Sequence, residues 1–168
     1  MKKIGIFYSF NTTKTGQAVK MLAEALGKEN IELINAETVT EEQILSFENL
    51  IFGVPTWFDG ELPNYWDEFV PAMEDMNLKG KKIAVFGNGD QKGYPENFVD
   101  AIGIMADLVE DRGAGLVGLT SAEGYTFESS RSLRGNRLAG LALDFENQPR
   151  QNKERISQWA EQLKKEFL

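Results

Sequence analysis

The chain has 168 residues, a length that fits one domain with a buried core, so a single domain over residues 1–168 is expected. Its 26 acidic and 18 basic residues give a formal net charge of -8, which disfavours nucleic acid and anionic membrane surfaces as partners and favours proteins with basic faces. Cysteine and histidine are both absent, which excludes disulfides, thiolate metal sites, cysteine nucleophiles and serine-histidine triads.

The first elements in chain order are a strand, a polar loop and a helix. Lys3 to Tyr8 is a short apolar run, Ser9 to Thr15 is polar, and Gly16 to Leu26 has apolar residues at three- and four-residue intervals. Gly27 is a typical residue for the end of that helix. The first run is too short for a signal peptide, and no later run approaches the ~20 residues of a membrane span, so we expect a cytoplasmic protein.

The rest of the chain alternates in the same way between apolar runs and helical patterns. Further strands are predicted at Ile31 to Ile34, Asn49 to Val54, Lys82 to Phe86 and Gly115 to Leu119. Helices are predicted at Glu41 to Ser46, from about Asn64 onward, at Phe98 to Asp111 and from about Lys153 to Phe167. The apolar stretch Leu138 to Leu143 is interpreted as a continuation of the fifth strand after a polar interruption from Thr120 to Arg137.

This alternation predicts an α/β fold in three layers, with a five-stranded parallel sheet between helices on both faces. The common order for such a sheet is 2-1-3-4-5, which places the chain reversal between the first and third strands. Ligands bind at that point, at the carboxyl ends of the strands. The loops expected there are Ser9 to Thr15, Pro55 to Leu62 and Asn88 to Asn97.

The first of these loops offers hydroxyl groups, an amide and backbone N–H groups at the start of a helix. Such a site suits a phosphate. The loop has neither a GxxxxGK nor a GxGxxG pattern, so no P-loop and no dinucleotide site is indicated. The same residues are also typical of an ordinary helix N-cap, and the segment alone leaves both interpretations open.

The other two loops each carry an aromatic residue. Trp57 follows the third strand, and Tyr94 lies between Gly93 and Pro95. Two rings at one crevice could hold a flat ring such as an isoalloxazine between them. For each residue singly, capping a helix or covering a turn is the simpler interpretation, and it is the combination that favours a ligand.

Four stretches of the sequence resemble long-chain flavodoxins of the cyanobacterial type, in the same order and at matching spacing. They are KKIGIFYSFNTTKT, PTWFDGEL, FGNGDQKGYPENFVDAIG and GLALDFENQ. The interruption from Thr120 to Arg137 is similar to the insertion that separates long-chain from short-chain members. The resemblance covers essentially the whole chain and implies a flavodoxin-like fold whose fifth strand is split by an insertion.

The resemblance also implies a function. The protein would be a low-potential one-electron carrier, and not an enzyme, that uses non-covalently bound FMN and substitutes for ferredoxin. The phosphate would lie in the first loop, the isoalloxazine would lie between Trp57 and Tyr94, and the carbonyl of Phe58 would meet the flavin N5-H after one-electron reduction. No metal site is implied. The implied cofactor-binding residues are Ser9, Phe10, Asn11, Thr12, Thr13, Lys14, Thr15, Pro55, Thr56, Trp57, Phe58, Asp59, Gly60, Asn88, Gly89, Asp90, Tyr94 and Asn97.

The implied partners are redox proteins with basic docking faces, and the protein is expected to be a monomer. Family analogy names ferredoxin-NADP reductase, photosystem I and ferredoxin-dependent enzymes. Two departures from the family pattern bear on the site. Phe10 and Thr13 stand where Thr and Gly are usual, and Phe58 stands at a turn position where Asn or Gly is usual, although a bulky residue disfavours positive φ.

Two other functions are open to this fold. An FMN-dependent quinone or NAD(P)H oxidoreductase would need an open site over the flavin for hydride transfer, and Trp57 covering that face argues against it. A receiver-type phosphoacceptor would need clustered aspartates after the first and third strands, and Tyr8-Ser9 and Pro55-Thr56 offer none.

Overall fold

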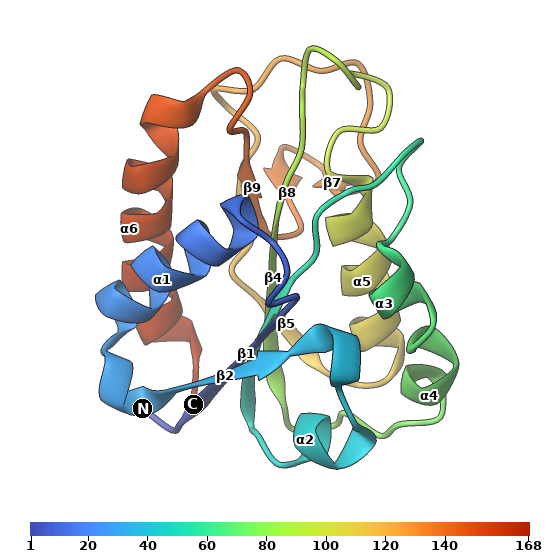
Figure 1. Ribbon diagram of the computed structural model, residues 1–168, viewed down its shortest axis with the longest axis vertical. Coiled ribbons are helices and arrows are strands. Elements are labelled where there is room, and N and C mark those ends of the chain that lie inside the picture. The colour runs from blue at the N-terminus through green and yellow to red at the C-terminus, as the bar shows by residue number, and fades with distance from the viewer.

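The centre of the molecule is a parallel β-sheet, and the computed structural model describes all 168 residues (Figure 1). Its strands are β1 (Ile4–Tyr8), β2 (Ile31–Asn35), β3 (Asn49–Gly53), β4 (Lys82–Asn88), β5 (Gly115–Val117) and β9 (Leu141–Leu143). They follow the order β2-β1-β3-β4-β5, and β9 also pairs with β4. All of these pairs are parallel, so the predicted order 2-1-3-4-5 is confirmed.

The fifth position of the sheet is shared by two short strands. β5 pairs with the first half of β4, where Lys82 lies opposite Gly115, and β9 pairs with the second half, where Phe86 lies opposite Leu141. The fifth strand is therefore split by the intervening segment, as predicted.

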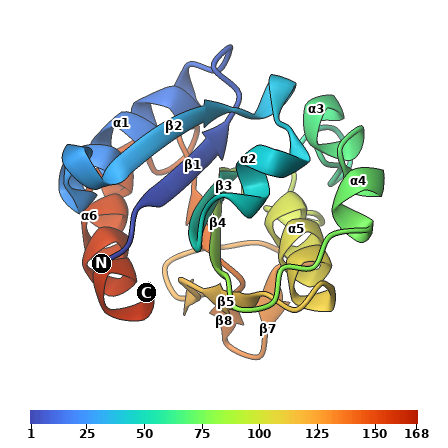
Figure 2. The ribbon, with the colours of Figure 1, turned by 90° about the horizontal axis from the view of Figure 1, so that it is seen from below.

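Helices cover both faces of the sheet, as Figure 2 shows from below. They are α1 (Lys14–Leu26), α2 (Glu41–Leu45), α3 (Asn64–Asp67), α4 (Val70–Glu74), α5 (Asp100–Asp111) and α6 (Pro149–Glu166), with short 3-10 turns η1 (Lys28–Asn30) and η2 (Ala36–Thr38). α1 and α6 lie on one face, and α3, α4 and α5 lie on the other. None of the helices combines the length and the hydrophobicity that a membrane-spanning helix needs.

The two faces bury two apolar clusters because successive residues of a strand point to opposite sides. Ile51 packs with α1 and α6 in one cluster, whereas its neighbours Leu50 and Phe52 pack with α5 in the other. Every residue of β3 is buried, which explains its nearly continuous apolar sequence. Among the buried polar groups, the indole N–H of Trp66 donates to the carbonyl of Gly53 at 2.9 Å.

The segment between β5 and β9 forms a small antiparallel sheet with the order β6-β8-β7. Its strands are β6 (Thr120–Ser121), β7 (Leu133–Arg134) and β8 (Arg137–Leu138). The prediction that Leu138 continues the fifth strand is therefore wrong, because Leu138 pairs with Thr120 and Leu133. The parallel ladder resumes only after Gly140, where a Cβ would come 1.9 Å from the carbonyl oxygen of Val85.

The largest departures from the predicted helix bounds are in three regions. The helix after Asn64 is broken into α3 and α4, since Pro71 lacks the N–H that a continuous helix would need. α5 starts at Asp100 and not at Phe98, because Val99 has a left-handed backbone with φ 48°. α6 starts four residues before the predicted Lys153, at Pro149, a residue that suits a first helical turn.

Candidate functional site

A cavity of about 320 Å³ lies where the loops after β3 and β4 meet. These two loops lie in the upper half of Figure 1. Its lining consists of Thr56, Trp57, Phe58, Gly89, Asp90, Tyr94, Asn97, Phe98 and Val99. Seven of these residues belong to the set predicted from the sequence. Phe98 and Val99 were missed because their apolar side chains fit the pattern of the following helix.

The aromatic walls of the cavity come from two different loops. Trp57 is half-buried, and its backbone forms a bridge with Glu61 through hydrogen bonds of 2.9 and 2.7 Å, which closes the turn between them. Tyr94 is 53% exposed, and its N–H donates to the carbonyl of Asp90 at 2.9 Å. The structure therefore brings both predicted rings to one cavity, with the tyrosine ring accessible from solvent.

The only two non-glycine residues with positive φ, Phe58 and Val99, both line this cavity. Their φ angles are 47° and 48°, a region that bulky and β-branched side chains disfavour. Phe58 thus adopts the conformation that its side chain opposes, and its ring is 70% exposed. Strain of this kind concentrates at functional sites, where the surrounding structure holds it in place.

The hydroxyl groups of the loop before α1 form hydrogen bonds within the loop and to β4. Ser9 is buried, its Oγ accepts from the N–H of Asn11 at 3.2 Å, and its carbonyl accepts from the hydroxyl of Thr12 at 2.7 Å. The hydroxyl of Thr15 donates to Oδ1 of Asn88 at 3.1 Å, which connects this loop to the end of β4. The first turn of α1 has no acidic residue, and the N-cap residue Thr13 makes no side-chain capping bond. The N–H groups in the first turn of α1 therefore suit an anion.

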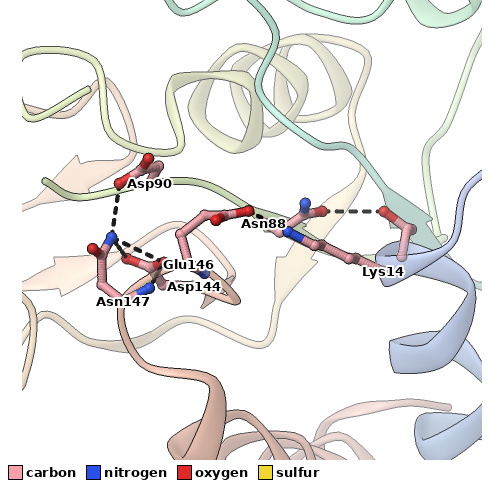
Figure 3. Close-up of polar contacts among 7 residues, drawn as sticks. Lys14, Asn88, Asp90, Asp144, Glu146 and Asn147 are labelled. Carbon is pink, nitrogen blue, oxygen red and sulfur yellow. Dashed lines mark hydrogen bonds and ion pairs between the residues drawn. The ribbon is translucent and has the colours of Figure 1, made fainter. Parts of the chain in front are cut away.

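Three other residues predicted for this loop lie at its surface. The ring of Phe10 is half-exposed and packs on Tyr8 with a centroid distance of 5.1 Å. The amide of Asn11 donates to Oε2 of Glu37 at 2.6 Å. Lys14 forms an ion pair with Glu146, which lies in the connection between β9 and α6 (Figure 3). The ammonium of Lys14 is thus already paired.

The connection from β9 to α6 is a fourth segment at this end of the sheet, and sequence reasoning assigned none of its residues to the site. Asn147 donates through Nδ2 to Asp90 at 2.7 Å and to both carboxylate oxygens of Asp144. Figure 3 shows Asn147 between these two aspartates and Glu146 facing Lys14. The signal available in the sequence was a mostly polar stretch, residues 144–148, directly after a buried strand at the carboxyl edge of the sheet.

Two buried carboxylates near the cavity have shifted pKa values in opposite directions. Burial raises the pKa of Asp100, although the N–H and the charge of Arg131 oppose the shift. Burial alone would also raise the pKa of Asp144, but hydrogen bonds from Asn147 and Gln91 outweigh it and hold the pKa below its ordinary value. Asp144 is therefore ionised at neutral pH.

The geometry suits a flat aromatic ligand with an anionic group. Two aromatic rings flank the cavity, and the free N–H groups of an uncapped helix lie at the neighbouring loop. No group of three or more acidic, cysteine or histidine side chains could hold a metal ion.

Comparisons with known proteins agree with this geometry. A family model described as Flavodoxin matches residues 6–159. The flavodoxin of Nostoc sp. (strain PCC 7120) is 39% identical over 166 residues, which cover 99% of this chain and 98% of that protein. A flavodoxin of Klebsiella pneumoniae is 38% identical over 176 residues and covers the whole of both chains.

A solved structure shows the same likeness in three dimensions. The crystal structure of Fusobacterium nucleatum flavodoxin bound to flavin mononucleotide is 35% identical in sequence, covers the whole of both chains and superimposes with a TM-score of 0.94.

Proposed function

The chain belongs to the flavodoxin family, and on that premise we propose that it is an FMN-binding electron carrier and not an enzyme. FMN would bind without a covalent bond in a single domain over residues 1–168, and the protein would pass single electrons between redox proteins in place of ferredoxin. For flavodoxins in general, the order 2-1-3-4-5 is associated with FMN at the switch point between the first and third strands. The observation that carries the proposal is the pair of aromatic rings from separate loops, Trp57 and Tyr94, at one cavity.

The residues present fit FMN. The isoalloxazine would lie between Trp57 and Tyr94, with Thr56, Asn88, Gly89, Asp90 and Asn97 at its polar edge or along the ribityl chain. The phosphate would be held at the start of α1 by N–H groups and hydroxyls of residues 9–15, where no side chain caps the helix. The proposed donors are uncharged, since the ammonium of Lys14 is paired with Glu146.

When bound, FMN supplies the redox chemistry by accepting electrons one at a time. The chain's own residues bind it, shield its ring from water and orient the backbone of the turn at Phe58, Asp59 and Gly60 toward it. The acidic groups around the cavity, with a net charge of -8 on the whole chain, disfavour the addition of negative charge at this place. A strongly reducing lower couple is the expected consequence.

The partners would be redox proteins with basic docking faces, because exposed acidic residues such as Asp59, Glu61 and Glu96 surround the cavity. Ferredoxin-NADP reductase, photosystem I and ferredoxin-dependent enzymes are proposed on family analogy alone. A monomeric state and a cytoplasmic location are proposed on the same basis.

A reductive titration of the purified protein with added FMN tests the function. We expect binding that quenches the fluorescence of FMN, followed by two separate one-electron steps as reductant is added. A polypeptide that retains no yellow flavin after excess FMN has been added and removed again would contradict the proposal. Rapid reduction of the bound flavin by NADPH alone, with no reductase present, would favour an oxidoreductase instead.

A further inference from the structure

The carboxylate of Asp144 is fully buried directly after β9 and accepts hydrogen bonds from three residues. Gln91 donates through its backbone N–H at 3.1 Å and through Nε2 at 2.8 Å. The backbone N–H groups of Glu146 and Asn147 donate at 3.0 and 2.9 Å, and the side-chain amide of Asn147 adds a further bond of 2.9 Å. No lysine or arginine pairs with Asp144, so these N–H donors alone stabilise its charge.

The same donors connect Asp144 to the cavity. The side-chain amide of Asn147, which donates to Asp144, also donates through Nδ2 to Oδ1 of Asp90 at 2.7 Å. The same oxygen of Asp90 accepts from the N–H of Gly93 at 2.8 Å. The N–H of Tyr94 donates to the carbonyl of Asp90 at 2.9 Å. Residues 90–94 therefore form a tight turn whose first residue is held from below through Asn147 (Figure 3).

The second residue of that turn is held as well. Gln91 is buried, and its side chain spans two segments, since Nε2 donates to Asp144 while Oε1 accepts from the N–H of Thr126 at 2.6 Å. All the groups around the carboxylate of Asp144 are N–H donors, so both of its oxygens must accept. An amide or a protonated acid at position 144 would replace one acceptor by a donor, and buried N–H groups would then lose their partner. The arrangement requires an ionised carboxylate.

We propose that Asp144 is a positioning residue of the flavin site, which fixes the turn of residues 90–94 and so holds Asp90 and the ring of Tyr94 against the cofactor. Asp144 itself does not line the cavity and acts only through Gln91 and Asn147. The effect of Asp144 on the cofactor rests on the proposed FMN-binding function. The fixing of the turn does not depend on FMN, because it is a property of the polypeptide alone.

Asp144→Asn tests the proposal, because it keeps the shape of the side chain and removes the charge. Asn49→Ala is the matched control. Asn49 is also fully buried and also links distant segments, through bonds of 3.0 to 3.1 Å with Lys2 and Leu168. It is the first residue of β3, at the end of that strand away from the cavity.

Amide hydrogen exchange of the apoproteins is the first measurement, and it needs no cofactor. In Asp144→Asn we expect exchange at residues 90–94 to accelerate by about tenfold or more, because unpaired buried donors destabilise the turn. In Asn49→Ala the same amides should exchange at the wild-type rate after correction for the loss of global stability.

Affinity for FMN, measured by fluorescence quenching, is the second measurement. We expect Asp144→Asn to raise the Kd by about ten- to one-hundredfold and Asn49→Ala to change it less than about threefold. The visible circular dichroism of the bound flavin should change in the first variant only, because it reports the geometry of the aromatic rings around the flavin.

Asn147→Ala covers the case in which Asp144→Asn does not fold, since Asn147 is only half-buried. It should produce the same changes at a smaller size. Unchanged exchange at residues 90–94 and an unchanged Kd in the variant at position 144 or 147 would overturn the inference, as would an equal rise in Kd in Asn49→Ala. If the wild-type protein binds no FMN, the proposed function fails, while the exchange measurement still decides whether Asp144 fixes the turn.

Discussion

Gly60 lies directly against the carboxylate of Asp100. A Cβ at position 60 would come 2.6 Å from Oδ2 of Asp100 and 3.0 Å from Cβ of Asn97, and Gly60 has φ 87°. The turn that follows Trp57 is therefore fitted onto the start of α5, and both the space and the backbone angle at position 60 require glycine.

Gly60→Ala should destabilise the apoprotein for both reasons, and Gly80→Ala separates them. Gly80 has nearly the same φ, 85°, but a Cβ there would meet nothing within 4 Å. We expect Gly80→Ala to lower the free energy of unfolding by about 1 kcal/mol because of backbone strain. Gly60→Ala should lower it by about 1–3 kcal/mol more because of the clash. Urea unfolding of the two apoproteins measures the difference, and equal losses would show that the contact with Asp100 relaxes freely.

Phe58→Gly should stabilise the apoprotein by about 1 kcal/mol, because glycine accepts positive φ without the cost that a side chain adds. Little packing is lost, since the ring of Phe58 is 70% exposed. Phe58→Ala is the control, because it removes the ring and keeps the Cβ that causes the strain. In urea unfolding, the free energy of unfolding should be higher for Phe58→Gly than for the wild type. Phe58→Ala should be no more stable than the wild type. If alanine stabilised as much as glycine, the ring and not the backbone would be the source of strain.

The sheet was predictable from the sequence, because strands are indicated by local apolar runs and their order follows general rules for parallel connections. Apolar runs such as Asn49 to Val54 indicate buried parallel strands, and the crossover rules then leave few orders for five of them. The predicted aromatic pair at the cavity followed from the order, since the loops after the first, third and fourth strands meet at one edge.

The features that the sequence did not indicate depend on contacts between distant segments. Val99 fits a helical pattern, and only the structure shows that its backbone is left-handed, with its carbonyl bonded to the hydroxyl of Ser132. Lys14 was assigned to the phosphate loop by resemblance, and its pairing with Glu146, 132 residues away, has no local signal. The network around Asp144 escaped prediction for the same reason, because its partner Gln91 lies 53 residues away.

The stability of the apoprotein should respond to Asp100 and Asp144 with opposite signs as pH changes. The pKa of Asp100 is raised by burial, so its contribution to stability is present below the ordinary aspartate pKa of about 3.9 and is lost as pH rises through the higher folded value. Asp100→Asn keeps an acceptor for the N–H of Arg131, and we expect it to be more stable than the wild type at neutral pH, with the gain fading in acid.

For Asp144 the pKa is lowered, so its contribution is present above about 3.9 and is lost as pH falls through the lower folded value. Asp144→Asn should therefore show its largest loss of stability at neutral pH and a smaller loss in acid. Urea midpoints of both variants and the wild type between about pH 3 and pH 7 measure the two trends. Parallel curves for the three proteins would contradict both assignments.

Tyr94→Ala should weaken FMN binding with little effect on the fold, because the ring is 53% exposed and stands at the cavity. Loss of an aromatic contact and of the apolar area that it covers should raise the Kd by about tenfold or more. Leu45→Ala removes a similarly exposed apolar side chain from α2, the helix at the bottom of Figure 1 and far from the loops of the cavity, and it should leave the Kd unchanged. An unchanged Kd in Tyr94→Ala would place the flavin elsewhere.

Glu146→Gln should tighten FMN binding at low salt. Glu146 pairs with Lys14 at the first residue of α1, beside the loop proposed for the phosphate. The substitution removes a negative charge from the neighbourhood of the phosphate and releases the ammonium of Lys14, and both effects favour the anion.

Because Lys14 and Glu146 are both largely exposed, the gain should be modest, about two- to fivefold in Kd, and should shrink as salt is added. Fluorescence titrations at two ionic strengths measure it, with Glu154→Gln on the outer surface of α6 as a charge-matched control. Lys14→Met should weaken binding by no more than about threefold, since in the native protein the ammonium is held by Glu146. A loss of tenfold or more in Lys14→Met would mean that the lysine leaves Glu146 and pairs with the phosphate when FMN binds.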